Sequence, residues 1–312
     1  MLRILSAKAL LAAFALLAVA VLGGCGQYSP DYMKPLSPEM RALIAQKGMR
    51  EQAPITIRVF KEESVLEVWK QKDDGRYYFL KSYPICNYSG ELGPKLKQGD
   101  RQAPEGFYIV SKNQMNPRSK YHLAFNIGFP NAYDRAWGRT GSNIMVHGDC
   151  KSAGCYAMTD ALVEEIYILA REALAGGQEY FMIQAYPFKM TSANMAKHRG
   201  NKWYGFWQNL KQGYDYFETT RQIPEIQVCN RSYLINAVFN NPRQRPDPSR
   251  PCPAYRRLPV RPFSPAPAQT AENKQSSIKP LGSALGLAFG PREPTYHMFT
   301  LGPADPRPAS SE

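Results

Sequence analysis

The sequence predicts a β-rich α+β fold, in which mixed β-sheets are accompanied by a few helices. Short runs of β-branched and aromatic residues, separated by turn residues, occur throughout the middle of the 312-residue chain. Few segments have the periodicity of an amphipathic helix, and no long alternation of strand and helix indicates a doubly wound sheet. Without its two ends the chain retains about 205 residues, enough for one domain with a sizeable core.

A capped helix and a series of strands are expected in the first half of this domain. Ser37 and Pro38 are typical of a helix start, and the apolar spacing that follows ends near Gly48. The next three runs predict an antiparallel meander, because an Asp-Asp-Gly turn at 73–75 separates the second run from the third. The expected strands cover residues 55–60, 64–69, 77–83, 106–111, 121–127 and 143–146.

Two longer helices and three strands are expected in the second half. Thr159 can cap the first helix, whose apolar stripe stops at Gly176. The second helix is expected over residues 202–212, and the strands over residues 180–186, 225–229 and 232–238. This arrangement places His147 just after a strand and Cys155 on the approach to a helix.

Both ends of the chain differ in composition from this domain. Residues 1–25 have a positive start and an apolar run too short to span a bilayer, which is typical of an export signal. The run ends Leu-Gly-Gly-Cys, which resembles a bacterial lipobox and predicts lipidation of Cys25. The alternative is an ordinary secretory signal cleaved near Gly24. Residues 26–54 are expected to form a tether and the N-terminal helix, and the proline-rich residues 241–312 a disordered tail.

The expected compartment changes how the charge of the chain is interpreted. A formal net charge of +13 would otherwise favour binding to nucleic acid. An exported chain rarely meets nucleic acid, so no nucleic-acid partner is expected. Membrane headgroups and the carboxylate-rich peptides of the cell wall are the available polyanions, although scattered surface charge is an equally good explanation. We expect a membrane-anchored lipoprotein that faces the periplasm. Gly26 is not an obvious inner-membrane retention residue, which favours the outer membrane.

Residues 147–158, His-Gly-Asp-Cys-Lys-Ser-Ala-Gly-Cys-Tyr-Ala-Met, place a histidine upstream of a cysteine. An imidazole that takes the proton of a thiol generates a thiolate, which predicts Cys155 as a nucleophile and His147 as its general base. Gly154 lets the backbone turn tightly, so that nearby amide groups can stabilise an oxyanion. The N-terminus of the following helix is expected to favour the thiolate. Ser152 lacks the Gly-x-Ser-x-Gly context of a serine nucleophile and is expected to shape the loop.

The other cysteines leave several alternatives open. Two disulfides among Cys86, Cys150, Cys229 and Cys252 can form in three ways. Cys150 is alternatively a small buried residue, or a partner for Cys155 in a reversible disulfide that blocks the nucleophile. A zinc site built from His147 and these two cysteines lacks a second ligand pair, so neither a metal nor another cofactor is expected.

The His-Gly pair followed by Ser-x-Gly-Cys resembles the signature of the L,D-transpeptidase (YkuD) family. The compact spacing, with Ala153 where other members have a second histidine, is similar to the YafK-like branch. Residues 86–95, 99–108, 187–191 and 206–207 are also similar to this branch, so the resemblance covers roughly residues 55–240. It implies the β-rich catalytic fold of the family, with a substrate groove for which Lys95 and His122 are candidate lining residues.

The resemblance also implies the chemistry. Members of the family transfer acyl groups of peptidoglycan stem peptides through a cysteine thioester, and the YafK-like branch implies hydrolytic release of lipoprotein from diaminopimelate. One alternative is a synthetic enzyme that forms 3-3 cross-links or attaches lipoprotein. An alternative of another class is a membrane-tethered cell-wall binding protein without turnover. The expected partners are therefore stem peptides, with or without a linked lipoprotein, and the membrane that holds the lipid anchor.

Overall fold

A computed structural model describes residues 30–264 of the chain. The predicted export signal, the lipid site at Cys25 and the tail beyond residue 264 lie outside the described residues. Within residues 30–264, no helix is both long and apolar enough to cross a membrane. The described part contains two five-stranded sheets and two smaller two-stranded sheets, which confirms the predicted class of mixed β-sheets with few helices.

The first sheet contains the predicted meander. Its strands are β1 (Ile55–Phe60), β2 (Val65–Gln71), β3 (Tyr77–Pro84), β5 (Gly106–Ser111) and β10 (Tyr180–Tyr186). They lie in the order β3-β2-β1-β10-β5, and the antiparallel pairing of β1 with β2 and of β2 with β3 confirms the meander. β1 also pairs in parallel with β10, so the centre of the sheet joins segments far apart in the sequence.

The second sheet carries the candidate site. Its strands are β4 (Asn87–Tyr88), β6 (Met115–Ser119), β7 (His122–Asn126), β8 (Met145–His147) and β9 (Tyr156–Ala157), in the order β4-β9-β8-β7-β6. His147 is the last residue of β8 rather than the residue after a strand, which corrects the predicted strand end at residue 146. β4 and β9 were not predicted, because two residues are too few to show a periodicity.

The described residues contain the three predicted helices and two short helices that were not predicted, at residues 132–136 and 192–197. They are α2 (Pro38–Gln46), α3 (Ala132–Ala136), α4 (Asp160–Ala175), α5 (Ser192–Lys197) and α6 (Tyr204–Thr220), with 3-10 turns η1 (Asp31–Met33) and η2 (Lys112–Gln114). The side chain of Thr159 accepts from the Leu162 amide, as its predicted capping role requires. α6 continues past its predicted end at residue 212, because Gly213 does not stop the helix. A Cβ there would overlap the Phe107 ring, so the glycine allows α6 to pack on β5.

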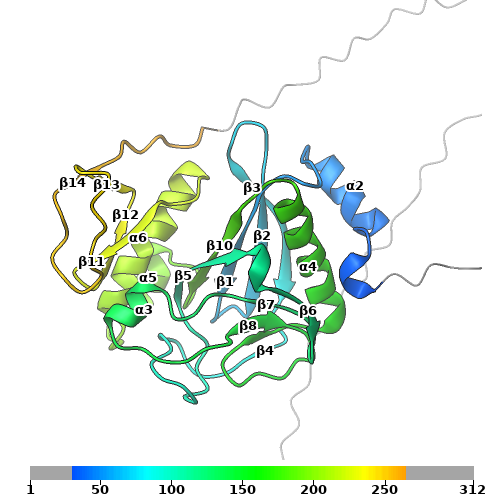
Figure 1. The fold of residues 1–312 in the computed structure, drawn as a ribbon, viewed down its shortest axis with the longest axis horizontal. Coiled ribbons are helices and arrows are strands. Elements are labelled where there is room, and N and C mark those ends of the chain that lie inside the picture. Colours follow the sequence, from blue (N-terminus) through cyan, green and yellow to red (C-terminus); the bar gives the residue numbers. More distant parts are fainter. Residues whose placement is uncertain (1–29, 265–312) are drawn as a thin grey trace, which may run out of the picture. The chain divides into compact units, whose positions relative to one another are not determined.

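Two helices cover opposite faces of the first sheet (Figure 1). α4 packs between this sheet and β7 of the second sheet, and its buried residues share one core with Ile55, Ile57 and Val59 of β1. Phe60 of β1 belongs to a second core that includes Trp207 of α6. Because successive side chains of a strand point to opposite faces, β1 is buried along its whole length. The two sheets also contact each other directly, because Phe125 of β7 packs on Phe181 of β10 with ring centroids 5.6 Å apart. One core is thus shared by both sheets and α4.

The C-terminal part of the described chain corrects the predicted boundary at residue 240. β11 (Ile226–Cys229) pairs with β12 (Ser232–Ile235), and β13 (Ala237–Phe239) pairs with β14 (Tyr255–Arg257). A Cys229–Cys252 disulfide joins the two hairpins. Residues 241–264, predicted to belong to a disordered tail, therefore pack with the domain. Their prolines flank an edge strand, a position that proline tolerates, and a disulfide stabilises the connection.

Candidate active site

Strands β8 and β9 place His147 and Cys155 on the same face of the second sheet. Val146 pairs in parallel register with Tyr156, so Cys155 lies opposite Met145, two residues before His147. Side chains in register, and those two residues apart on one strand, point to the same face. Strand spacing and rise give a diagonal separation of roughly 8 Å between the two backbone positions. The predicted pair is therefore brought together by tertiary pairing and not only by nearness in sequence.

The ring of His147 is held in one tautomer. Its Nδ1 lies 2.6 Å from the carbonyl oxygen of Gly148, and because a carbonyl only accepts, Nδ1 carries the proton. The lone pair of the neutral ring is then on Nε2. The ring of Tyr121 lies beside the imidazole, with centroids 4.9 Å apart. Burial lowers the pKa of His147, against an opposing effect of the Gly148 hydrogen bond, so the ring is suited to accept a proton only transiently.

The thiol of Cys155 is enclosed by the backbone before β8. The Met145 amide donates to Sγ at 3.4 Å, and Sγ lies 3.8 Å from the carbonyl oxygen of Asn143. Burial raises the pKa of Cys155, while the Met145 amide and the Lys95 ammonium lower it. The prediction that the following helix favours the thiolate is wrong for the net shift, because the pKa of Cys155 is raised. β9 separates Cys155 from Asp160, where α4 begins, and a helix dipole decays within the first turn.

Hydrogen bonds define the loop before Cys155. Ser152 Oγ donates to the Cys155 carbonyl at 2.8 Å, accepts from the Gly154 amide at 3.2 Å and lies 3.1 Å from Ser89 Oγ. These contacts use the hydroxyl's one donor and both acceptor positions, which leaves no role for Ser152 as a nucleophile in this arrangement. Gly154 has φ +128°, a left-handed value that favours glycine. Its amide is already bonded to Ser152, so the Cys155 amide is the better candidate donor to an oxyanion.

A disulfide between Cys86 and Cys150 fixes the middle of the same loop. This pairing decides one of the open alternatives, and Cys155 is the free cysteine within residues 30–264. Cys150 is therefore neither a plain buried thiol nor the partner of Cys155, and its sulfur is not available to a zinc ion with His147. The Cys150 amide donates to Met158 O at 3.2 Å, and the Met158 amide to His147 O at 2.7 Å. These two hydrogen bonds thus connect the beginning of the loop after β8 with the residue that follows β9.

The charge of the Lys95 ammonium lowers the pKa of Cys155, against the larger effect of burial. The side chain of Lys95 is buried, and its Nζ bonds to the Asp100 carboxylate and to Lys97 O. A Cβ on Gly141 would lie 2.9 Å from Lys95 Cε, which places the lysine between the 93–100 loop and the segment leading to β8. This candidate groove residue therefore belongs to the surroundings of Cys155.

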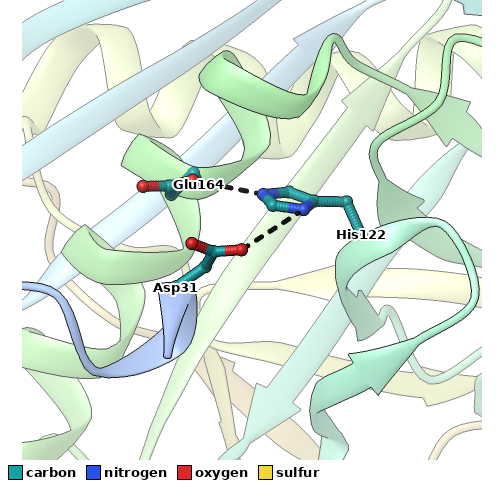
Figure 2. A group of neighbouring side chains, drawn as sticks. All are labelled: Asp31, His122 and Glu164. Atoms are coloured by element: carbon teal, nitrogen blue, oxygen red, sulfur yellow. Dashed lines mark hydrogen bonds and ion pairs between the residues drawn. The ribbon is translucent and has the colours of Figure 1, made fainter. Parts of the chain in front are cut away.

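His122 faces two carboxylates, those of Asp31 and Glu164, in a charged cluster (Figure 2). Its Nε2 lies 3.2 Å from Glu164 of α4, and its Nδ1 lies 3.8 Å from Asp31 of η1. Lys34 joins the same two carboxylates, at 2.7 Å from Asp31 and 2.9 Å from Glu164. The ligand atoms of His122, Asp31 and Glu164 are close enough together to hold a metal ion. However, the two carboxylates contact opposite ring nitrogens, and the ammonium of Lys34 neutralises them. We interpret the cluster as an ion-pair network that holds η1 on α4.

Tyr121 is a site residue that the sequence reasoning missed. It is 46% exposed although its ring packs on His147, and its carbonyl accepts from the Gly148 amide at 3.0 Å. An aromatic side chain at a turn was the available signal, but the partner of that ring is decided by the pairing of β7 with β8. Tyr121 shields one face of the imidazole from water.

Residues 54–174, which contain His147, Cys155 and the loop between them, match the sequence profile of the YkuD family, described as the L,D-transpeptidase catalytic domain. The chain is 48% identical over 189 residues to the Escherichia coli strain K12 protein named "Putative L,D-transpeptidase YafK", an alignment that spans 61% of this chain and 76% of that protein. The chain belongs to the L,D-transpeptidase family. The corresponding protein of Escherichia coli O157:H7 is equally similar to this L,D-transpeptidase over the same lengths.

One solved structure is also similar to part of this chain. The helical cell shape determining protein Pgp2 from Campylobacter jejuni is 19% identical, and the match covers 58% of this chain and 68% of that chain with a TM-score of 0.35. At this TM-score the superposition is too loose for a comparison of sites. The family assignment rests on sequence, and it agrees with the expected YkuD-like fold and YafK-like branch.

Proposed function

We propose that the protein is a cysteine acyltransferase that releases lipoprotein from peptidoglycan by hydrolysing the bond between diaminopimelate and a lipoprotein lysine. The observation that carries the proposal is the position of Cys155 directly before β9, beside Met145 of the parallel strand β8 that ends at His147. The carbonyl of Gly148 orients the imidazole so that Nε2 is the proton acceptor. This arrangement supports a thiol nucleophile with its own general base.

In the first step, His147 Nε2 takes the Sγ proton as the sulfur attacks the carbonyl carbon at the L-centre of diaminopimelate. A C–S bond forms, and backbone amides near Cys155 stabilise the tetrahedral oxyanion. The C–N bond then breaks, and the lysine amine leaves with the proton from His147. The stem peptide remains on the enzyme as a thioester.

In the second step, water attacks the thioester carbonyl while His147 removes one of its protons. The C–S bond breaks, the sulfur recovers its proton from His147, and the stem peptide leaves with a carboxylate. An amine as acceptor would instead give a cross-link or attach lipoprotein. The similarity to the YafK-like branch supports water.

The experiment is incubation of the purified protein with muropeptides, some of which carry the lipoprotein-derived lysine, followed by mass spectrometry. We expect loss of that lysine, and no loss with Cys155→Ala or His147→Ala. Formation of 3-3 dimers without lysine release would refute the hydrolytic proposal in favour of synthesis. A Cys155 that reacts with neither a carbapenem nor a thiol reagent would favour a binding protein without turnover.

We also propose that the protein is held at the outer membrane, facing the periplasm, by a lipid on Cys25. The lipobox-like sequence before this cysteine supports the anchor. Cys25→Ser is expected to release the protein from the membrane fraction. Retention of this variant in that fraction would contradict the proposal.

A further inference from the structure

A cavity of about 340 Å³ lies between α3, the start of α6 and the β11–β12 turn. Aromatic side chains form much of its wall, namely Tyr133, Trp137, Trp203 and Phe206. Three cations also line it, Arg139, Lys202 and Arg231, and no lining residue in the described chain is acidic. A pocket that combines fixed aromatic rings with cations is suited to a ligand with apolar faces and anionic or hydrogen-bond-accepting groups.

Trp137 presents a fixed indole to this cavity. Its Nε1 donates to the carbonyl of Arg231 at 2.9 Å, and its ring lies 6.3 Å from that of Tyr133. The side chain is nevertheless 52% exposed, whereas Trp207 in the core is fully buried. An indole that is held in place with half of its surface in water is available to stack on a ligand ring.

The cations are arranged around the same rings. Arg139 is buried, its Nη1 donates to Asp134 at 2.8 Å, and its guanidinium lies 5.1 Å from the ring centres of both Tyr133 and Phe206. Its Nε has no hydrogen-bond partner among residues 30–264. Lys202 and Arg231 each lie over one indole of the cavity. The charge of Arg139 is neutralised by Asp134, so Lys202 and Arg231 give the cavity its net positive charge.

Two segments connect this cavity with the thiol. Met145, whose amide contacts Cys155, lies six positions after Arg139, so the connection spans at most about 20 Å. The indole of Trp203 lies against Gly93, where a Cβ would overlap it, and Gly93 belongs to the same loop as Lys95. A substrate that is bound at Cys155 and extends beyond one peptide can therefore reach the cavity.

We propose that this cavity binds the glycan strand of peptidoglycan next to the stem peptide under attack. Sugar rings have apolar faces that pack on Trp137 and Trp203, and their acetamido and hydroxyl oxygens accept hydrogen bonds from cationic side chains. Stem carboxylates complement Lys202 and Arg231. The inference rests on the proposed function for the identity of the polymer, while the cavity itself indicates a ligand with apolar faces and anionic or hydrogen-bond-accepting groups.

The first test compares two substrates of the full chain: a disaccharide-bearing muropeptide, and the same stem peptide without sugars. Trp137→Ala is expected to lower the ratio of the two kcat/KM values roughly three- to tenfold, through KM of the sugar-bearing substrate. Tyr180→Ala is the matched control, because Tyr180 is 50% exposed at the start of β10 and should leave the ratio at the wild-type value. An unchanged ratio in Trp137→Ala would overturn the proposal.

A binding measurement tests the cavity independently of turnover. The full chain with Cys155→Ala is titrated with the N-acetylglucosamine–N-acetylmuramic acid disaccharide and followed by indole fluorescence. We expect saturable binding that is weakened by Trp137→Ala and by Lys202→Gln but not by Tyr180→Ala. Absence of saturable binding would refute the glycan site, whereas sugar binding without turnover of either substrate would refute only the proposed hydrolysis.

Discussion

The pKa of Cys155 is raised and the pKa of His147 is lowered, because the protein partly encloses the thiol and buries the imidazole. Burial disfavours the charged forms, so it raises the pKa of the thiol and lowers the pKa of the imidazole. Both shifts favour a neutral thiol beside a neutral imidazole in the resting protein. In the proposed reaction the proton then moves as the sulfur attacks, and His147 acts as a base rather than as the counter-ion of a preformed thiolate.

This neutral pair predicts how alkylation of Cys155 depends on pH. Because only the thiolate reacts, the rate with iodoacetamide should rise with pH and reach its plateau only above the ordinary thiol pKa of about 8.5. Stopped alkylation followed by mass spectrometry of the Cys155 peptide gives the profile. A plateau that begins below neutral pH would contradict a raised pKa and indicate a preformed thiolate–imidazolium pair.

At the scale of elements, the site depends on a short loop between two very short strands. Asp149 and Cys150 have φ values of +66° and +50°, which are costly for residues other than glycine and persist only where the surroundings hold them. The Asp149 amide donates to Asp160 at 2.8 Å, and the disulfide to Cys86 holds the next residue. The loop geometry is therefore imposed by contacts with α4 and with the segment before β4.

Removal of the Cys86–Cys150 disulfide should change both stability and reactivity. The bond closes a loop of 64 residues, so Cys86→Ser with Cys150→Ser is expected to lower the free energy of unfolding by about 4 kcal/mol. It should also slow turnover, because the loop before Cys155 loses its fixed point. Denaturant unfolding and muropeptide hydrolysis measure the two effects.

The matched control removes the Cys229–Cys252 disulfide, which is not part of the active-site loop. The Cys229→Ser, Cys252→Ser variant should lose stability, by about 3 kcal/mol, but keep wild-type turnover under conditions where it is folded. Equal losses of turnover in both double variants would show that the first disulfide has no specific effect on the site.

A buried lysine holds the loop that carries Lys95. Nζ of Lys61 contacts Glu91 O at 2.7 Å, and Gly93 O, Ala103 O and Glu105 Oε1 at 3.0 Å each. Lys61→Met leaves a buried carboxylate and three carbonyls without this partner, and we expect it to lower the free energy of unfolding by about 3–5 kcal/mol.

Denaturant titration measures this effect, with Lys197→Met as the control. Lys197 pairs with Glu62 at 2.7 Å on the surface, where its side chain is 63% exposed, so its loss should cost less than about 1 kcal/mol. A Lys61 variant as stable as the Lys197 variant would refute the structural role of the buried ammonium.

At the scale of the whole molecule, the described domain extends beyond its two five-stranded sheets. β14 pairs with β13, and the Phe263 amide donates to Thr219 O at the end of α6. A chain that ends at residue 240 loses β14 and Cys252, whereas a chain that ends at residue 264 keeps both.

We therefore expect the shorter chain to unfold more easily by about 3 kcal/mol or more, since it lacks the disulfide as well as the strand. The midpoints of denaturant unfolding of the two truncated chains test this expectation. Equal midpoints would support the boundary at residue 240 that composition alone suggested.

The sequence by itself determined the fold class, the meander, the capped start of α4 and the catalytic candidates. These features are local, because hydrophobic periodicity, capping residues and the His-Gly…Ser-x-Gly-Cys spacing lie within single segments. Family membership is also a property of sequence.

Only the tertiary structure decided which cysteines pair, that Tyr121 packs on His147, and that His122 belongs to an ion-pair network instead of the site. It also reversed the expected pKa shift of Cys155 and extended the domain to residue 264. Each of these depends on contacts between segments distant in sequence, such as Cys86 with Cys150. Periodicity and composition do not specify such contacts, since the packing of the sheets and α4 brings those segments together.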